Sequence, residues 1–308
     1  MPPFVVGVVG PTATGKSDLA IALARRLDGE VVGADASQLY RGMDIGTAKV
    51  PEVERRGVPH HQVDVLEVTE EASVAAYQRH ARADIEAVLA RGRLPVVAGG
   101  SGLYVRAALD RLEIPPTDPR VRATLQHRLD RDGLAPLLAE LRAADPRAAA
   151  AIEPNNGRRV VRALEVIALT GRPFSATMPT REFVRPTVLV GLRTDREALD
   201  RRVDRRAADM FAAGLLDETR GLVERGLREG RTASRAVGYA QALAVLDGTS
   251  TLEDAVADTA LRTRRLVRRQ ESWFGADPRV TWFDPLGADR DDLLERVVAH
   301  VTHNGPHG

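Results

Sequence analysis

Short apolar runs alternate with longer segments of helical periodicity along most of the chain. The runs are rich in valine and are typical of strands buried on both faces of a parallel sheet. They lie at residues 4–9, 30–35, 62–66, 94–98, 187–192 and 280–283. The segments between them, such as 17–27 and 73–91, repeat apolar residues at helical spacing. This alternation predicts an α/β fold with a parallel sheet flanked by helices.

The strand pattern is interrupted between residue 118 and about residue 171. That stretch is rich in alanine, leucine and arginine, begins at the proline-rich turn 114–119, and is followed by a loop, 171–186, with three prolines. It predicts a small all-helical insertion in the sheet domain. We therefore expect a catalytic core of residues 1–113 and 187–301, a helical insertion of residues 114–186, and a flexible tail of residues 302–308. Helices are also expected at 195–213, 215–228, 234–246 and 252–274.

Composition excludes several classes of protein. Hydrophobic residues make up 44% and charged residues 28% of the chain, and no segment approaches the roughly 18 apolar residues of a membrane span. The first ten residues lack a cationic start and lead into a glycine loop, so they predict a strand and no secretory signal. The absence of cysteine excludes disulfides, a thiolate zinc site and a cysteine nucleophile. We expect a cytoplasmic enzyme without a membrane anchor or an evident obligate protein partner.

Charge points to local patches as binding surfaces. The net charge is only +1, so nucleic-acid binding would depend on clusters of arginine. All but two of the 44 basic residues are arginine; the exceptions are Lys16 and Lys49. An ammonium is a compact point charge, whereas a guanidinium is a planar fork, so a tight loop around a phosphate accepts lysine more readily. Lys16 is therefore a candidate phosphate ligand.

A phosphate-binding loop follows the first predicted strand and opens a helix, the context that supports this motif. It matches the pattern G-x-x-x-x-G-K-[ST] and consists of Gly10, Pro11, Thr12, Ala13, Thr14, Gly15, Lys16 and Ser17. Backbone N–H groups of such a loop converge on phosphate oxygens, the lysine bridges phosphates, and the Ser17 hydroxyl can bind Mg²⁺. The alternative is a plain glycine turn. The loop alone does not define which phosphate compound binds.

Two further loops follow predicted strands at the same edge of the sheet, where α/β proteins form ligand sites. Asp35 ends the second strand and is expected to face the phosphate loop. It has three possible roles: an outer carboxylate near Mg²⁺, a general base for the acceptor, or a structural cap of the next turn. The loop 99–104 follows the fourth predicted strand and is rich in small residues that could admit a substrate.

Histidines and aromatic residues have mainly structural interpretations. His60 and His61 would point to opposite faces of a strand, and no carboxylate lies at ligand spacing, so we expect no metal site there. Trp273, Phe274 and Trp282 are expected in the core. Aromatic residues make up only 4% of the chain. For a nucleic-acid ligand, this favours a pocket for one extruded base over a platform for several stacked bases.

Taken together, these motifs and several other segments resemble the tRNA dimethylallyltransferase family. The segments occur in the family's order and at similar spacing; they are 10–17, 35–49 (DASQLYRGMDIGTAK), 59–61 (PHH), 99–104, 158–166 (RRVVRALEV), 235–239 (RAVGY) and 263–274 (TRRLVRRQESWF). The resemblance implies a P-loop NTPase-like core and a helical insertion domain that grips the anticodon stem loop of tRNA. It implies transfer of a dimethylallyl group from dimethylallyl diphosphate to N6 of the adenine 3′-adjacent to the anticodon, with Mg²⁺ as cofactor.

The resemblance also assigns roles to residues. It implies that Asp35 is the general base, that Lys16, Ser17 and Arg206 surround the diphosphate and Mg²⁺, and that Ser101 lies near both substrates. The residues it places in contact with tRNA are Asp35, Ala36, Ser37, Gln38, Ser101, Arg122, Arg158, Arg159, Val160, Val161, Arg162, Arg235, Gly238 and Tyr239. A second arginine stripe, at positions 262, 265 and 269, is expected on the last long helix.

Two other functions are compatible with the phosphate loop and Asp35. A nucleoside or small-molecule kinase would use ATP in the same loop, and an RNA-binding module could use a nucleotide only as a switch. The arginine-rich insertion argues against the kinase. Binding of allyl diphosphate in preference to ATP, together with salt-sensitive tRNA affinity, would separate the three functions.

Overall fold

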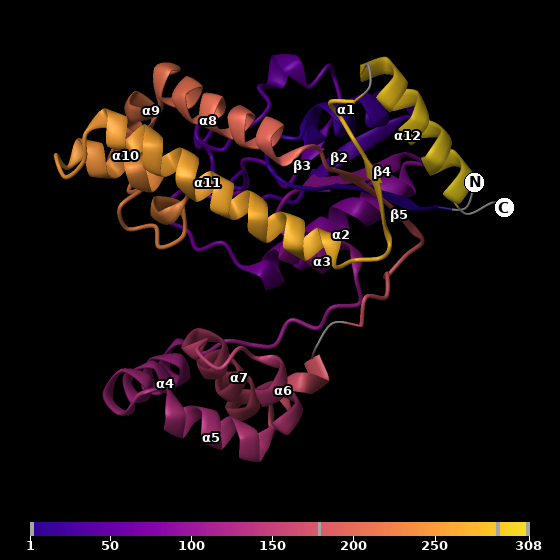
Figure 1. Cartoon of the computed structure of the whole chain (residues 1–308). Coiled ribbons are helices and arrows are strands. Elements are labelled where there is room, and N and C mark those ends of the chain that lie inside the picture. The colour runs from indigo at the N-terminus through magenta and orange to yellow at the C-terminus, as the bar shows by residue number, and fades with distance from the viewer. Residues whose placement is uncertain (1–2, 178–179, 288–289, 306–308) are drawn as a thin grey trace. The chain divides into compact units, whose positions relative to one another are not determined.

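The computed structural model describes residues 3–177, 180–287 and 290–305. The chain divides into a larger unit, Met1–Leu109 with Phe183–Gly308, and a small unit, Asp110–Glu182 (Figure 1). The boundaries of the small unit lie about four residues before the expected positions 114 and 186. The reason is that the two connecting segments pair with each other, with the Arg111 amide donating to the Glu182 carbonyl at 2.7 Å.

A six-stranded parallel sheet forms the centre of the larger unit. Its strands are β1 Val5–Val9, β2 Gly29–Gly33, β3 His60–His61, β4 Leu94–Gly99, β5 Thr187–Leu192 and β6 Val280–Phe283. Their order is β3-β2-β4-β1-β5-β6, and every neighbouring pair is parallel. The carboxyl ends of all strands therefore meet at one edge, as the sequence pattern predicts for an α/β fold.

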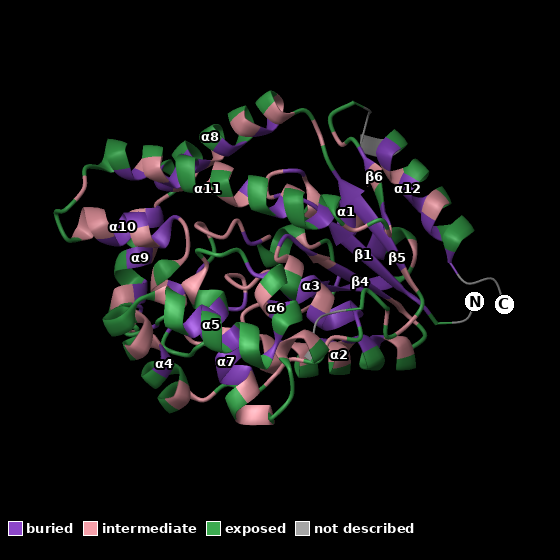
Figure 2. Ribbon diagram, turned by 60° about the horizontal axis from the view of Figure 1, so that its bottom comes forward, coloured by how far each residue is buried: buried purple, intermediate pink, exposed green. Residues whose placement is uncertain are grey.

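Helices cover both faces of this sheet because successive residues of a strand point to opposite sides. Val6 and Val8 pack in one hydrophobic core with residues of α1 (Lys16–Arg26) and α12 (Arg290–Asn304). Gly7 between them faces Leu109 at the end of α3 (Gly102–Leu109), which packs beside α2 (Val74–Ala90). Figure 2 shows the resulting buried strands beneath helices with exposed outer faces.

Four more helices complete the larger unit next to the sheet. They are α8 Arg196–Ala212, α9 Leu215–Glu224, α10 Tyr239–Leu246 and α11 Leu252–Gly275. Asp195 and Thr251 cap the amino ends of α8 and α11 by accepting backbone N–H groups three residues later. The α8 and α11 helices pack against each other (Figure 1), which brings residues more than 60 positions apart to one place.

The predicted third strand was placed wrongly. The expected strand at 62–66 is a loop with one isolated bridge from Leu66 to Tyr40, and the strand itself is His60–His61. Gln62 and Asp64 have φ angles of 56° and 57°, a left-handed conformation that a strand does not accept. The expected helices 215–228 and 234–246 are also shorter, because the chain turns at Gly226 (φ 87°) and Gly238 (φ 93°).

The small unit is an all-helical bundle. Its helices are α4 Pro119–Asp132, α5 Leu134–Ala144, α6 Pro146–Ala151 and α7 Gly157–Thr170, followed by a 3₁₀ turn at Phe174–Thr177. Asp118, Asp145 and Asn156 cap α4, α6 and α7, and proline occupies the first turn of α4 and α6. Leucines and valines from α4, α5 and α7 form its own hydrophobic core.

Residues 302–304, where a flexible tail was expected to begin, are helical. Helix α12 continues to Asn304, since Val297 and Val301 are buried in the core beside the sheet and hold its last turns. Residues 306–308 lie outside the described part of the chain. Among the described residues, no helix combines the length and apolar character needed to span a membrane.

Candidate active site

The phosphate loop joins β1 to α1 at the carboxyl edge of the sheet. Gly10 has a φ of 134°, and a Cβ there would overlap the carbonyl oxygen of Leu192 in β5, so only glycine fits. Gly15, with a φ of 88°, caps the start of α1. The backbone N–H groups at the start of that helix have no partner within the helix and form an anion-binding end. The local geometry therefore suits a phosphate group.

Lys16 is the charged residue of this loop. Its Nζ donates to the Pro11 carbonyl at 2.6 Å, and the Thr14 hydroxyl donates to the same carbonyl at 2.8 Å. Desolvation by the surrounding protein, opposed by Asp35 and reinforced by Arg206, lowers the pKa of Lys16 to about 8. The ammonium is thus held in a site where an added anion would stabilise its charge.

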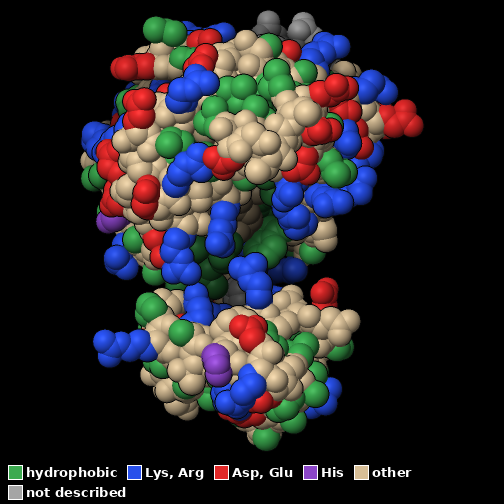
Figure 3. All heavy atoms as spheres, turned by 90° about the vertical axis from the view of Figure 1, so that its left-hand side faces the viewer, with side chains coloured by type: hydrophobic (Ala, Val, Ile, Leu, Met, Phe, Trp, Pro, Cys, Tyr) green, Lys and Arg blue, Asp and Glu red, His purple; other side chains and the backbone are tan. Residues whose placement is uncertain are grey.

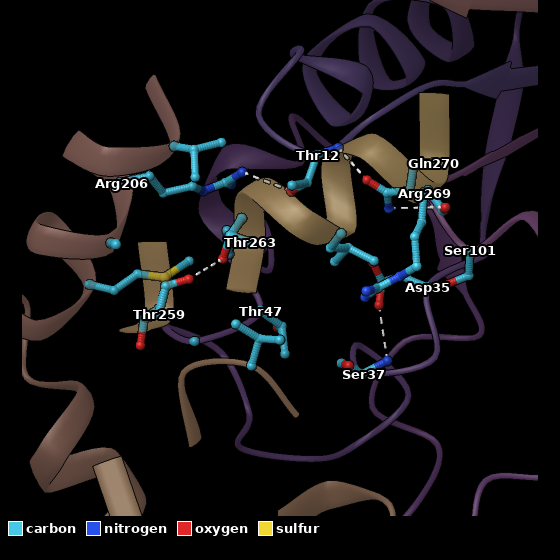
Figure 4. A pocket seen from close by; sticks show the side chains of 18 of the residues that line it. Thr12, Asp35, Ser37, Thr47, Ser101, Arg206, Thr259, Thr263, Arg269 and Gln270 are labelled. Carbon is cyan, nitrogen blue, oxygen red and sulfur yellow. Dashed lines mark hydrogen bonds between the residues drawn. The ribbon is translucent and has the colours of Figure 1, made fainter. Parts of the chain in front are cut away.

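A cavity of about 420 Å³ opens next to the loop (Figure 4). Polar groups from three strand ends line it: Thr12 after β1, Asp35 and Ser37 after β2, and Ser101 after β4. Side chains of α8 and α11 close the other sides, and they include the apolar residues Val203, Ala207, Met210 and Leu266. The cavity thus combines a phosphate end with apolar walls, a common composition for a small-molecule site.

Asp35 and Ser101 lie on neighbouring loops because β2 and β4 are adjacent strands. The Asp35 carboxylate accepts the Ser37 amide at 2.9 Å, and the Ser101 hydroxyl accepts the Ala36 amide at 3.5 Å. Both side chains line the cavity, so the structure brings together the two residues that the sequence placed near the acceptor. The Ser37 contact is also the local turn bond expected of a structural aspartate.

Arg206 on α8 reaches the phosphate loop. Its guanidinium donates to the Thr12 hydroxyl at 3.4 Å, and it also lines the cavity. Burial lowers the pKa of Arg206, and the positive charge of the neighbouring Arg202 lowers it further. By contrast Arg201, Arg202 and Arg205 are exposed. Asp35, Lys16 and Arg206 therefore form one electrostatic cluster.

Helix α11 supplies residues that the sequence analysis did not assign to the site. Arg269, Gln270 and Trp273 line the cavity, although only the arginine was part of an expected RNA-binding stripe. Trp273 is 44% exposed and packs on Gly102, so its expected place in the core was wrong. Phe274, its neighbour, is buried as expected. The signal available in the sequence was the helical spacing of residues around position 270. One face of α11 is buried, and the adjacent face borders the cavity.

The loop 44–49 forms another wall of the cavity and is held by charged side chains. The Glu218 carboxylate accepts the backbone N–H groups of Ile45 and Gly46 and the Tyr239 hydroxyl. Lys49, the second lysine, donates to Asp44 and Asp64 at 2.6 and 2.5 Å, so it stabilises the loop.

Two residues expected to contact tRNA are buried here. Tyr239 is fully buried with its hydroxyl bonded to Glu218, and Gly238 is a buried turn residue at the start of α10. Burial raises the pKa of the Tyr239 hydroxyl, and Glu218 raises it further. Both residues support the wall of the pocket, and their expected contact with tRNA stays a prediction. Arg235, another expected tRNA contact nearby, is exposed. Gln38, also expected to contact tRNA, donates its side-chain amide to the Thr47 carbonyl at 3.1 Å.

Two valines expected at the tRNA surface of the small unit are instead in its core. Val160 is 0% and Val161 3% exposed, because they occupy the inward face of α7. Their side chains face that core in this structure, and their expected contact with tRNA stays a prediction. Arg158 and Arg159, which directly precede these valines in the same helix, are exposed.

Arg122 and Arg162 have a structural partner. Both donate to Oε2 of Glu165, at 2.7 and 2.8 Å, and the Asp118 amide donates to the other oxygen of that carboxylate at 3.0 Å. Burial would raise the pKa of Glu165, but the hydrogen bonds from Arg122 and Arg162 keep it below its ordinary value. Glu165 therefore neutralises part of the charge of these two arginines, and the shared carboxylate links α4 to α7.

The surface charge is mixed. The face drawn in Figure 3 carries basic side chains on each unit with acidic ones among them, in keeping with the net charge of +1. On α11, Arg262 pairs with Asp258 at 2.6 Å, whereas Arg269 faces the cavity. Any RNA affinity of this chain must come from particular arginines.

His60 and His61 have structural partners. The ring of His60 contacts the Val58 carbonyl at 2.9 Å, and that of His61 contacts the buried Glu30 carboxylate at 2.7 Å. No group of three or more His, Asp or Glu residues suitable for a metal occurs in the described part of the chain. A divalent ion would therefore take few protein ligands, which suits Mg²⁺ with its preference for phosphate oxygens and waters. Ser17, exposed at the start of α1, fits this donor set.

Comparison with known proteins extends these observations. A family model described as IPP transferase matches residues 38–277. The tRNA dimethylallyltransferase of Nocardia farcinica is 61% identical over 285 residues, which is 92% of this chain and 90% of that protein. That of Streptomyces avermitilis is 58% identical over 299 residues, 97% of this chain and 96% of that protein.

Solved structures are similar as well. The full-length tRNA isopentenylpyrophosphate transferase of Bacillus halodurans aligns with a TM-score of 0.72 and 40% identity, covering 99% of this chain and 97% of that one. A eukaryotic dimethylallyltransferase that acts on tRNA aligns with a TM-score of 0.84 and 26% identity, covering 98% of this chain and 79% of that one. Since both kinds of match span nearly the whole sequence, this chain belongs to the tRNA dimethylallyltransferase (IPP transferase) family.

Proposed function

We propose that this chain transfers the dimethylallyl group of dimethylallyl diphosphate to N6 of the adenine 3′-adjacent to the anticodon of tRNA, with release of diphosphate. Family membership supports the reaction. The observation that carries it within the structure is the cavity in which a phosphate loop with Lys16 and Arg206 meets an edge carrying Asp35 and Ser101, with apolar walls between them. That combination provides places for a diphosphate, a prenyl chain and an amine.

Catalysis in this proposal acts mainly by stabilising the leaving group. In the reaction the bond between the allylic carbon and the diphosphate oxygen breaks, and its electron pair departs with diphosphate. Lys16, Arg206 and the N–H groups at the start of α1 stabilise that charge, and they are held in place before the reaction begins. Such a preorganised donor typically contributes about 3 kcal/mol to lowering the barrier. Val203, Ala207, Met210 and Leu266 provide the apolar wall for the dimethylallyl group.

The acceptor nitrogen needs less catalytic assistance than the leaving group. The lone pair of an adenine amine is delocalised into the ring, so N6 becomes acidic only as its bond to carbon forms. Asp35 then accepts the proton that N6 loses, and Ser101 orients the amine at the same edge. General-base assistance of this kind is typically worth about 10² to 10⁴-fold.

The Ser17 hydroxyl would hold Mg²⁺, which would supply charge neutralisation of the diphosphate. Affinity for tRNA comes from exposed arginines, of which Arg158, Arg159 and Arg235 are our candidates for phosphate contacts. In this proposal the small unit grips the anticodon stem loop, and the flipped adenine enters the cavity.

The kinase alternative shares the phosphate loop but is not favoured by any of the matched relatives named above.

The direct test is transfer of label. The purified chain is incubated with isotopically labelled dimethylallyl diphosphate, Mg²⁺ and unmodified tRNA, and the RNA is digested to nucleosides. We expect label in N6-dimethylallyladenosine, and none with a control tRNA that carries guanine at the target position. Label that stays in the donor, or phosphate transfer from ATP under the same conditions, would overturn the proposal.

A further inference from the structure

A buried glutamine amide bridges the two halves of the cavity. Gln270 lies on α11 and is 8% exposed. Its Oε1 accepts the backbone N–H of Thr12 at 2.9 Å, and its Nε2 donates to the Gly100 carbonyl at 3.0 Å (Figure 4). These partners lie 258 and 170 residues away in the sequence. One side chain therefore ties the phosphate loop to the loop that follows β4.

The direction of this amide is set by its partners. A backbone N–H can only donate and a carbonyl can only accept, so Oε1 must face Thr12 and Nε2 must face Gly100. The fit on the Gly100 side is close, because a Cβ at Gly100 would overlap Nε2. No other neutral side chain of that length carries one acceptor and one donor in this arrangement.

The two bridged loops carry the reacting groups. Thr12 also receives the hydrogen bond from Arg206, so the phosphate loop is held by Gln270 through its backbone and by Arg206 through its hydroxyl. Figure 4 shows these two side chains approaching Thr12 from opposite sides. Gly100 directly precedes Ser101, whose hydroxyl accepts the amide next to Asp35. The glutamine thus stands between the leaving-group side and the acceptor side.

We infer that Gln270 is a positioning residue that sets the separation between the phosphate loop and the Asp35–Ser101 edge. The inference rests on the proposed function. Transfer requires the allylic carbon and the adenine nitrogen in near-contact geometry, and a misplacement of about 1 Å can cost about 10²-fold in rate. Binding of either substrate alone depends on only one of the loops and is far less sensitive to their separation. Gln270 therefore acts on the rate of transfer more than on affinity.

Two substitutions separate this role from others. Gln270→Met keeps the length and removes both hydrogen bonds. We expect kcat for labelled-prenyl transfer to fall by about 10²-fold, with KM for each substrate changed less than about threefold. Gln270→Glu keeps an acceptor for the Thr12 amide but sets a carboxylate oxygen against the Gly100 carbonyl. It should lower kcat similarly and, because of its added charge near the diphosphate site, also raise KM for the donor.

The control is Gln126→Met in the small unit, since the Gln126 amide donates to Asp130 one turn away in its own helix. It should leave kcat unchanged. Melting temperature and Mg²⁺-dependent binding of inorganic pyrophosphate are measured for all variants, and both should stay near wild type in Gln270→Met. A kcat within threefold of wild type would overturn the inference, as would a loss of activity matched by lost folded protein in both Gln270 variants. Failure of the wild-type chain to transfer label would instead refute the proposed function.

Discussion

Arg206 and Thr12 lie 194 residues apart in the sequence, yet the guanidinium of the first donates to the hydroxyl of the second at 3.4 Å. The contact exists because α8 packs beside the phosphate loop, with Val203 buried one turn before Arg206. It places a second cation next to Lys16 at the same end of the cavity. A diphosphate bound there would meet both charges.

We predict that Arg206→Met lowers kcat for prenyl transfer by about 10² to 10³-fold, because one preorganised donor to the departing diphosphate is lost. Steady-state kinetics with labelled donor measures the effect. Arg205→Met is the matched control, since Arg205 is exposed on the same helix, and its kcat should stay within about threefold of wild type. Equal losses in the two variants would contradict a specific role for Arg206.

Asp35 is expected to affect the chemical step more than binding. Asp35→Asn keeps an acceptor for the Ser37 amide but removes the base, so kcat should fall by about 10² to 10⁴-fold while tRNA affinity changes little. Asp35→Ala should lose the turn contact as well. Single-turnover rates and equilibrium tRNA binding provide the two readouts. A near-normal rate for Asp35→Asn would refute the assignment of Asp35 as the base.

The pKa of about 8 for Lys16 predicts a pH dependence of diphosphate binding. Lys16 is mostly charged at pH 7 and loses its proton as the pH rises through 8, so affinity for Mg²⁺-pyrophosphate should fall by about fivefold between pH 8 and pH 9. Calorimetric titration from about pH 6.5 to about pH 9.5, which brackets this pKa, measures the fall. Lys16→Met should bind more weakly and lack this pH-dependent fall; an equally steep fall in that variant would show that another group titrates.

Replacement of Arg158 and Arg159 by alanine should weaken tRNA binding without changing pyrophosphate binding. If each arginine contacts one phosphate, the slope of log affinity against log salt should become shallower by about one to two units. Filter binding across a salt series gives the slope. Arg147→Ala, an exposed change elsewhere in the small unit, is the control. An unchanged slope in the double variant would place the RNA contacts elsewhere.

Glu165→Gln should destabilise the small unit. The carboxylate is fully buried and binds Arg122 and Arg162, so its loss leaves two cations without their partner at a cost of about 3 kcal/mol. Hydrogen exchange of α4 and α7 should then be faster by about 100-fold. Because its pKa lies below the ordinary value, this stabilisation is complete above about pH 4.5 and is lost as the pH falls further. Glu140→Gln removes an exposed pair with Arg128 and should have little effect.

Local sequence determined much of the protein. The phosphate loop was predictable because its eight residues are consecutive and their glycines meet local backbone requirements, as at Gly10 and Gly15. The strands at 187–192 and 280–283 were predicted with the observed bounds, and for the first of them the reason is that a buried parallel strand has a nearly unbroken apolar run. The resemblance to a family extended this to the reaction class, which the comparisons support.

Only the tertiary structure decided how distant segments meet. The place of Gln270 between Thr12 and Gly100, the partial exposure of Trp273, and the burial of Val160, Val161 and Tyr239 depend on which helix faces pack against which neighbours. A one-dimensional pattern reports that a helix has an apolar face but does not say whether that face meets a core or a cavity. The prediction misplaced the edge strand β3 for a related reason. Gln62 and Asp64 have left-handed backbone conformations that end the strand after His61. Nothing in their side chains required that conformation.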